Sequence, residues 1–74
     1  MSKEAFIAKE NGDAFIGWLN DNGYPWRAGK GDYQLMQVYC NKVWHPVYMG
    51  DKYPNNYKGI GPLGELMQDF NRSL

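Results

Sequence analysis

The stretch over residues 31–50 constrains the fold of this chain more than any other part of its sequence. It contains two runs rich in Tyr, Val, Trp, Leu and Met, residues 33–40 and 43–49, and a glycine closes it at each end. These side chains suit a pleated, half-buried surface, and the short polar break at Asn41-Lys42 indicates a hairpin. Because a lone hairpin is marginally stable in water, the rest of the chain is expected to pack on it.

A tight turn between the two runs sorts their side chains onto two faces, since opposed residues share a face. Asn-Lys lacks the glycine usual in a two-residue turn; a four-residue loop would keep this sorting and a three-residue loop would break it. The pairs expected on one face are Cys40/Val43, Val38/His45, Met36/Val47 and Gln34/Met49. The pairs expected on the other face are Tyr39/Trp44, Gln37/Pro46 and Leu35/Tyr48, with Tyr33 beside them.

The face with the tyrosines and Trp44 has two readings that the sequence leaves open. Either the Pro25-Trp26 arm and the segment 53–57 cover it, or it faces solvent, where an aromatic patch usually marks an interaction site. The face with valines and methionines is expected to lie against helices. Pro46 cannot donate to a strand ladder, so its strand is expected to be an edge strand or to be bulged there, and an edge is itself a docking surface.

Helices are expected on both sides of the hairpin. A helix over residues 13–22 is indicated by apolar pairs one turn apart, by Asp13 as N-cap and by the Asn-Gly stop at its end. For residues 3–10, a helical segment bent at Gly12 is favoured over a short strand, although Asn-Gly between apolar runs is also a hairpin signal. Proline at the first turn and apolar residues at helical spacing predict a second helix over residues 62–72.

The other segments carry loop signals, so the expected architecture is simple. Residues 24–31 combine proline with Gly-Lys-Gly, which lacks the Ser/Thr and the strand-before-helix context of a phosphate loop. Residues 50–61 contain three glycines, two asparagines and one proline. The expected fold is α+β, a single small domain over residues 1–74 with an N-terminal helix, a central antiparallel β-hairpin and a C-terminal helix.

Charge and aromatic content single out the middle of the chain. Eight basic and eight acidic residues balance, which argues against a generic nucleic-acid binder. Residues 24–58 nevertheless hold five basic and two acidic side chains, together with eight of the twelve aromatic residues. Such a charge distribution also arises by chance on a solvated surface. The aromatic residues are more informative, because Tyr and Trp combine a large apolar area with a polar group and anchor interfaces.

The single cysteine and the N-terminus bear on the compartment. Cys40 alone cannot form an internal disulfide, and one thiol fits a reducing, cytoplasmic setting. The opening Met-Ser-Lys-Glu leads into no long apolar run, so neither a signal peptide nor a membrane span is expected.

The residues provide little support for an enzyme or a metalloprotein. Cys40 and His45 fall on one predicted face, as in a thiolate–imidazole pair, but that face is the expected core, where both are usually structural. One Cys and one His do not make a metal site, and Asp51, Asn55 and Asn56 lack the spacing of a calcium loop. No catalytic residue, no metal and no cofactor is therefore expected.

Two stretches of the chain resemble a group of viral proteins. They are residues 18–38, with Trp-Leu, Asn-Gly-Tyr, Arg and Gly-Lys-Gly-Asp-Tyr-Gln-Leu-Met-Gln-Val in order, and Val-Trp-His-Pro-Val-Tyr at 43–48. This central half of the chain resembles small uncharacterised bacteriophage-encoded proteins. The resemblance implies a small protein made in the bacterial host cytoplasm and supplies no site residues. Compact phage proteins often inhibit or redirect a host enzyme or defence complex.

These features predict a non-catalytic module that binds a bacterial host protein through aromatic residues of the hairpin. Single-stranded nucleic-acid binding by interleaved aromatic and basic residues is the alternative, and a homodimer formed through the Pro46 edge or the aromatic patch is a third hypothesis. The predicted centre of the site is Tyr39, Trp44 and Tyr48, flanked by Trp26 and Tyr53, with Arg27, Lys30 and Lys42 as rim charges that set orientation.

Overall fold

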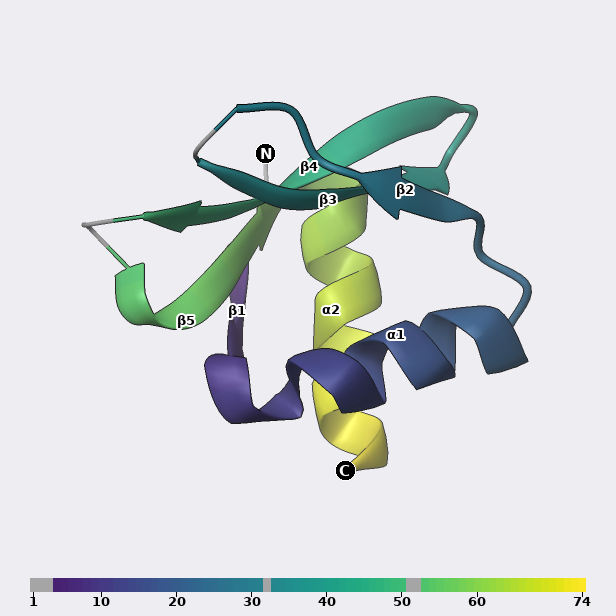
Figure 1. Ribbon diagram of the computed structural model, residues 1–74. Helices are drawn as coiled ribbons and strands as arrows, with labels where there is room; N and C mark the ends of the chain where they lie inside the picture. The colour runs from purple at the N-terminus through teal and green to yellow at the C-terminus, as the bar shows by residue number, and fades with distance from the viewer. Residues whose placement is uncertain (1–3, 32, 51–52) are drawn as a thin grey trace.

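The computed structural model describes residues 4–31, 33–50 and 53–74, which form an antiparallel sheet and two helices (Figure 1). The sheet has five strands in the order β1-β5-β4-β3-β2, so β2 to β5 are neighbours in sequence and β1 returns to pair with β5. In chain order the elements are β1 (Glu4–Ala8), the 3-10 helix η1 (Lys9–Asn11), α1 (Gly12–Asp21), β2 (Trp26–Ala28), β3 (Gln34–Cys40), β4 (Val43–Gly50), β5 (Tyr53–Ile60) and α2 (Gly61–Ser73).

The predicted architecture of helix, hairpin and helix is wrong. The hairpin exists as β3 and β4, but it is the middle of a larger sheet rather than a two-stranded unit. Residues 3–10 contain strand β1 where a helix was expected, and the segments 24–31 and 50–61 contain strands β2 and β5 where loops were expected. The polar β5 becomes a strand because β1 and β4 pair with its two edges, and pairing of this kind overrides local preference.

The two helices were predicted within about one residue at each end, and both lie on the same side of the sheet (Figure 1). Helix α1 connects the two edge strands, β1 and β2, and therefore crosses beneath the sheet. Its N-cap is Asn11 rather than Asp13, which lies in the first turn. Gly23 has a φ of 75°, the left-handed conformation expected after the helix end.

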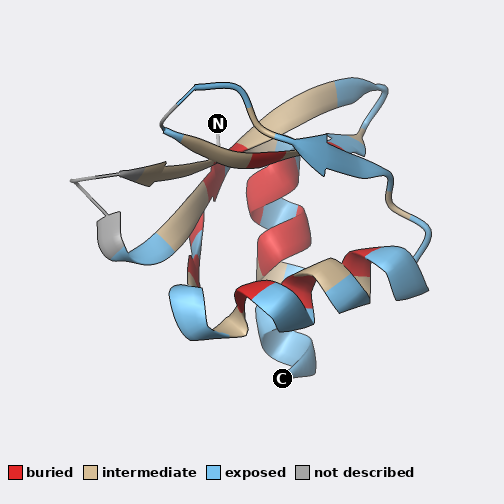
Figure 2. Cartoon of the chain, viewed as in Figure 1, coloured by how far each residue is buried: buried red, intermediate tan, exposed pale blue. Residues whose placement is uncertain are grey.

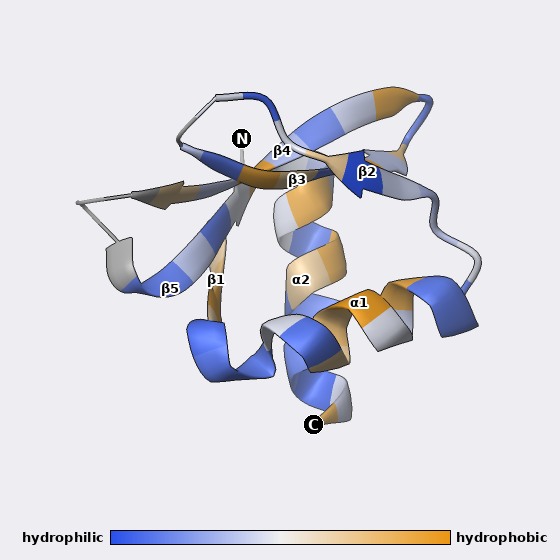
Figure 3. Ribbon diagram, in the orientation of Figure 1, coloured by the Kyte–Doolittle hydropathy of each residue, from blue (hydrophilic) through white to orange (hydrophobic). Residues whose placement is uncertain are grey.

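The core lies between the inner face of the sheet and the two helices, whose buried and apolar residues face it (Figures 2 and 3). Phe15 of α1 and Phe70 of α2 meet edge to face, with ring centroids 5.1 Å apart. Helix α2 packs closely on β5 at Gly59, where a Cβ atom would collide with Met67 and press on Leu63. The fully buried large side chains are Phe15, Phe70, Ile7, Leu19, Leu63, Met67, Val38 and Val47.

The register of the hairpin was predicted correctly from its turn as far as Met36. Asn41 and Lys42 have φ values of 51° and 66°, so the two residues form a tight turn with both φ positive, as in a type I′ turn. The pairs Tyr39↔Trp44, Val38↔His45 and Met36↔Val47 are present. A bulge then pairs Gln34 with Tyr48, so the expected pairs Gln34/Met49 and Leu35/Tyr48 are wrong.

Pro46 is not on an edge strand, because β4 lies between β3 and β5. It pairs with Gln37 of β3, whereas the described pairing of β4 with β5 begins at Tyr48↔Lys58. The missing N–H of Pro46 therefore interrupts no described pair with β5. This is how a central strand accommodates a proline, which sheets otherwise confine to edges and bulges.

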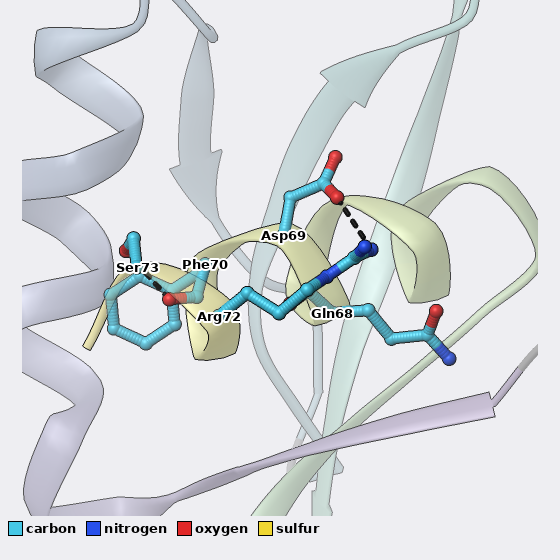
Figure 4. Close-up of polar contacts among 5 residues, drawn as sticks. All are labelled: Gln68, Asp69, Phe70, Arg72 and Ser73. Carbon is cyan, nitrogen blue, oxygen red and sulfur yellow. Dashed lines mark hydrogen bonds and ion pairs between the residues drawn. The ribbon is translucent and has the colours of Figure 1, made fainter.

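The last turn of α2 is held by short-range polar contacts (Figure 4). Arg72 Nη2 lies 2.7 Å from Asp69 Oδ1, and the Ser73 hydroxyl donates to the Phe70 carbonyl at 2.6 Å. Asn71 Nδ2 donates to the Phe6 carbonyl at 2.8 Å, which ties this turn to β1. A side chain at the end of the helix thus forms a hydrogen bond with one carbonyl of β1, a strand at the edge of the sheet.

Candidate functional site

The side of the sheet opposite the helices carries the predicted aromatic pair. Tyr39 and Trp44 face each other across β3 and β4, and Val38, which precedes Tyr39 in β3, is fully buried on the other side. Neither helix lies over the aromatic side (Figure 1), and β5 belongs to the sheet rather than covering it. Tyr39 is 39% exposed and Trp44 is half-buried. Tyr39 therefore faces solvent, whereas Arg27, in the strand that begins at Trp26, lies over the ring of Trp44.

Arg27 completes an aromatic–cation group on this side. The rings of Tyr39 and Trp44 meet edge to face, with centroids 5.3 Å apart and planes inclined by 63°. The guanidinium carbon of Arg27, on β2, lies 4.1 Å from the centroid of the Trp44 ring. At this distance the cation is attracted to the ring face, so the indole holds the arginine side chain against the sheet.

A chain of side-chain hydrogen bonds fixes the same arginine. Arg27 Nε donates to Gln37 Oε1 at 2.7 Å, and Gln37 Nε2 donates to Gln34 Oε1 at 3.1 Å. The backbone N–H of Lys30 donates to the same Gln34 oxygen at 3.2 Å, which ties the loop after β2 to this network. We call Arg27, Gln34, Gln37, Tyr39 and Trp44 the outer cluster. Its members hold one another, so a partner would meet a surface that is largely ordered beforehand.

A row of paired residues extends this surface toward β1. Tyr48 is opposite Gln34 on one side and Lys58 on the other, and Lys58 is opposite Phe6. The Lys58 ammonium lies 3.5 Å from Glu4 Oε1. Phe6 is 42% exposed. The outer face therefore continues across the sheet with an aromatic, a cation and a second aromatic residue.

The structure does not gather all the predicted site residues on one face. Trp26 is opposite Val38, so it lies on the helix side, and its Nε1–H donates to Asn20 Oδ1 of α1 at 2.9 Å. Lys30 and Lys42 are exposed in the loop after β2 and in the hairpin turn. The side chain of Tyr53 lies outside the described residues.

Sequence reasoning missed two members of the outer cluster, Gln34 and Gln37. The predicted register places Gln37 on the same face as Tyr39, so the sequence indicates its position. The sequence does not indicate its role, because only the structure shows Arg27 reaching across β3 to Trp44. Gln34 joins the face because the bulge shifts it by one position.

Cys40 and His45, which share the inner face of the hairpin, are not opposite each other. They are opposite Val43 and Val38 respectively, and burial raises the pKa of the Cys40 thiol. A protonated thiol is a poor nucleophile. The buried His45 Nε2 has no hydrogen-bond partner among the described residues, and no group of three His, Cys, Asp or Glu residues in that part of the chain could hold a metal ion.

The fold defines an α+β protein with two helices on one face of a five-stranded antiparallel sheet and an aromatic–cation group on the other. Comparison with protein-family models, curated proteins and solved structures finds no match for this chain. Within the described residues, neither helix has the length and apolar composition that a membrane crossing requires.

Proposed function

We propose that this protein is a non-catalytic module that binds another protein through the outer face of its sheet. The observation that carries this proposal is the outer cluster, where Tyr39, Trp44 and Arg27 lie together on a side that neither helix covers. Exposed aromatic patches of this kind usually mark interaction sites. Trp, Tyr and Arg are also the residues that contribute most to binding energy at protein interfaces.

The way the rings are used favours a protein partner over single-stranded nucleic acid. A base binds an aromatic platform by stacking on a free ring face, but Arg27 lies over the Trp44 ring and Tyr39 meets it edge to face. A base would have to displace the arginine and break its bond to Gln37. The balanced formal charge of the chain also gives no broad attraction to a polyanion.

The charges around the outer face complement an acidic protein surface. Arg27, Lys30 and Lys42 are exposed around it, and Lys58 lies in its paired row. Among the described contacts, the carboxylate near this face is that of Glu4, which contacts Lys58. By contrast, residues 61–74 of α2 and the C-terminus carry two acidic side chains and one basic side chain. Complementary charges of this kind steer and orient a partner.

The partner we propose is a bacterial host enzyme or defence complex, whose activity this module inhibits or redirects. The support is the resemblance of residues 18–38 and 43–48 to small bacteriophage-encoded proteins. An inhibitor needs a preformed docking surface rather than catalytic groups, and the outer cluster supplies such a surface.

The test compares two tryptophan variants on opposite faces of the sheet. Trp44→Ala removes the centre of the outer cluster, whereas Trp26→Ala removes an indole that is 38% exposed on the helix side. A protein captured from bacterial lysate on the wild-type chain is purified and titrated against all three forms. We expect Trp44→Ala to weaken its binding at least about tenfold, since a hot-spot residue contributes ~2 kcal/mol or more, and Trp26→Ala to bind normally.

Circular dichroism spectra and urea titrations verify that both variants remain folded. If folded Trp44→Ala binds as tightly as wild type, the proposal is wrong.

Titration with single-stranded oligonucleotides at low salt tests the alternative, which requires tight binding that weakens steeply as salt rises. Sedimentation tests a homodimer; edge pairing is disfavoured because β2 has only three residues and Asn71 occupies a carbonyl of β1.

A further inference from the structure

We infer that Arg27 is a prepared binding site for a carboxylate, so the protein surface that docks on the outer face carries an Asp or Glu at its centre. This inference rests on the proposed function and names the chemistry of the partner. It follows from which guanidinium nitrogens are already used. Arg27 Nε donates to Gln37, and the ring of Trp44 lies under the guanidinium group.

The two terminal nitrogens of Arg27 remain for a ligand. An arginine can grip a carboxylate side-on, through Nε and one Nη, or end-on, through both Nη groups. Gln37 occupies Nε, so the end-on geometry is the one available. The two ion pairs found among the described residues, Lys58–Glu4 and Arg72–Asp69, do not involve Arg27. The guanidinium group of Arg27 is thus exposed and held in one orientation. It forms no ion pair with a carboxylate in the described part of the chain.

The surroundings of Arg27 specify more than a negative charge. Stacking on Trp44 and the bond to Gln37 restrict a long side chain that would otherwise lose rotamer entropy on binding. Tyr39 lies edge to face against the same indole and is 39% exposed, so it offers apolar area beside the charge. The matching partner feature is a carboxylate next to an apolar or aromatic side chain, on a protein rather than on a nucleic acid.

A displayed library of random peptides, selected on the intact wild-type protein, tests this chemistry without a known partner. We expect enriched peptides to carry Asp or Glu beside an apolar residue. Synthetic copies of these peptides are then titrated against wild type, Arg27→Gln and Arg27→Lys. Both variants should bind at least about tenfold more weakly. Glutamine lacks the charge, and lysine keeps the charge but cannot form the two-pronged contact.

A double-mutant cycle assigns the contact. Changing the acidic residue of the peptide to its amide should weaken binding to wild type about tenfold and should change binding to Arg27→Gln little, because the two groups share one interaction. Gln37→Met frees Nε of Arg27 while keeping the arginine, and it should lower the affinity for the peptide by a smaller factor, about threefold. Such a result would mark Gln37 as a positioning residue.

The outcomes separate this inference from the proposed function. Peptides that lack acidic residues, or a cycle in which the two changes add, overturn the carboxylate site; if binding is still lost in Trp44→Ala, the docking face stands. If the selected peptides bind Trp44→Ala and Tyr39→Ala as well as wild type, or if the library enriches nothing beyond a Trp44→Ala control selection, both proposals fail. Tight binding of single-stranded oligonucleotide that depends on Arg27 assigns the site to phosphate instead.

Discussion

At the scale of single residues, the hairpin turn shows a local conflict between side chain and backbone. Asn41 and Lys42 both have positive φ, and lysine has no side-chain reason to adopt that conformation. Glycine adopts it without steric cost. Lys42→Gly should therefore raise the free energy of unfolding by about 0.5–1 kcal/mol, as measured by urea denaturation.

The matched control for this prediction is Lys42→Ala. It removes the same charge but keeps a Cβ atom in the left-handed conformation, so we expect no gain in stability. If both variants are equally stabilised, charge rather than backbone strain is responsible. A loss of stability in Lys42→Gly would contradict the turn geometry.

Cys40 gives a prediction that depends on pH. Burial disfavours the thiolate and raises the pKa of the thiol above its ordinary value, so at a given pH near neutrality the native protein holds less thiolate than a free cysteine. Alkylation by iodoacetamide should be slower in the native protein than in urea. Its rate should also reach half-maximum at a higher pH, as followed by mass spectrometry. Equal rates in the two states would show that Cys40 is not shielded.

At the scale of elements, the packing of α2 on β5 depends on a glycine. A Cβ atom at Gly59 would collide with Met67, whereas Gly17, inside α1, has nothing within 4 Å of its Cβ position. Gly59→Ala should lower the free energy of unfolding by about 1–3 kcal/mol through overpacking. Gly17→Ala should raise it by about 0.5–1 kcal/mol, because alanine is the better helix former.

Urea denaturation of the two alanine variants and of wild type checks that their free energies of unfolding change in opposite directions. Both changes add the same methyl group, but only the one at Gly59 meets a neighbouring side chain across the contact between helix and strand. A neutral Gly59→Ala would mean that Met67 moves aside without cost, and α2 would then be less closely packed than the structure shows.

At the scale of the whole molecule, one aromatic core joins the helices, while the outer cluster lies apart from it. Phe70 is 2% exposed and contacts both Phe15 and Trp18 of α1. Phe70→Ala should cost about 3–5 kcal/mol, which is comparable with the whole stability of a domain this small. This variant should be largely unfolded by circular dichroism at 25 °C.

Tyr39→Ala is the contrasting variant, because it removes an aromatic side chain from the outer face rather than from the core. We expect it to remain folded and to lose part of its binding. If Tyr39→Ala unfolds the chain, the outer cluster is needed for stability and its aromatic residues cannot be interpreted as a surface reserved for a partner.

Local signals explain what the sequence predicted well. The hairpin turn sets its own register, so the pairs from Cys40/Val43 to Met36/Val47 followed from the turn alone. Both helices show apolar spacing that repeats within a few residues, and their ends carry glycine or proline. The aromatic character of one hairpin face was visible for the same reason, because alternation along a strand determines which side chains share a face.

Tertiary structure alone decided the rest. Strands β1 and β5 pair across about fifty residues of chain, so neither segment could reveal its partner, and the polar β5 resembles a loop until both its edges are paired. Three features of the outer face and its neighbours depend on contacts between elements that are distant in sequence. They are the bulge that places Gln34 on the outer face, the contact of Trp26 with α1 and the position of Arg27 over Trp44. A helix satisfies its backbone within itself, whereas a strand depends on neighbours that distant sequence supplies.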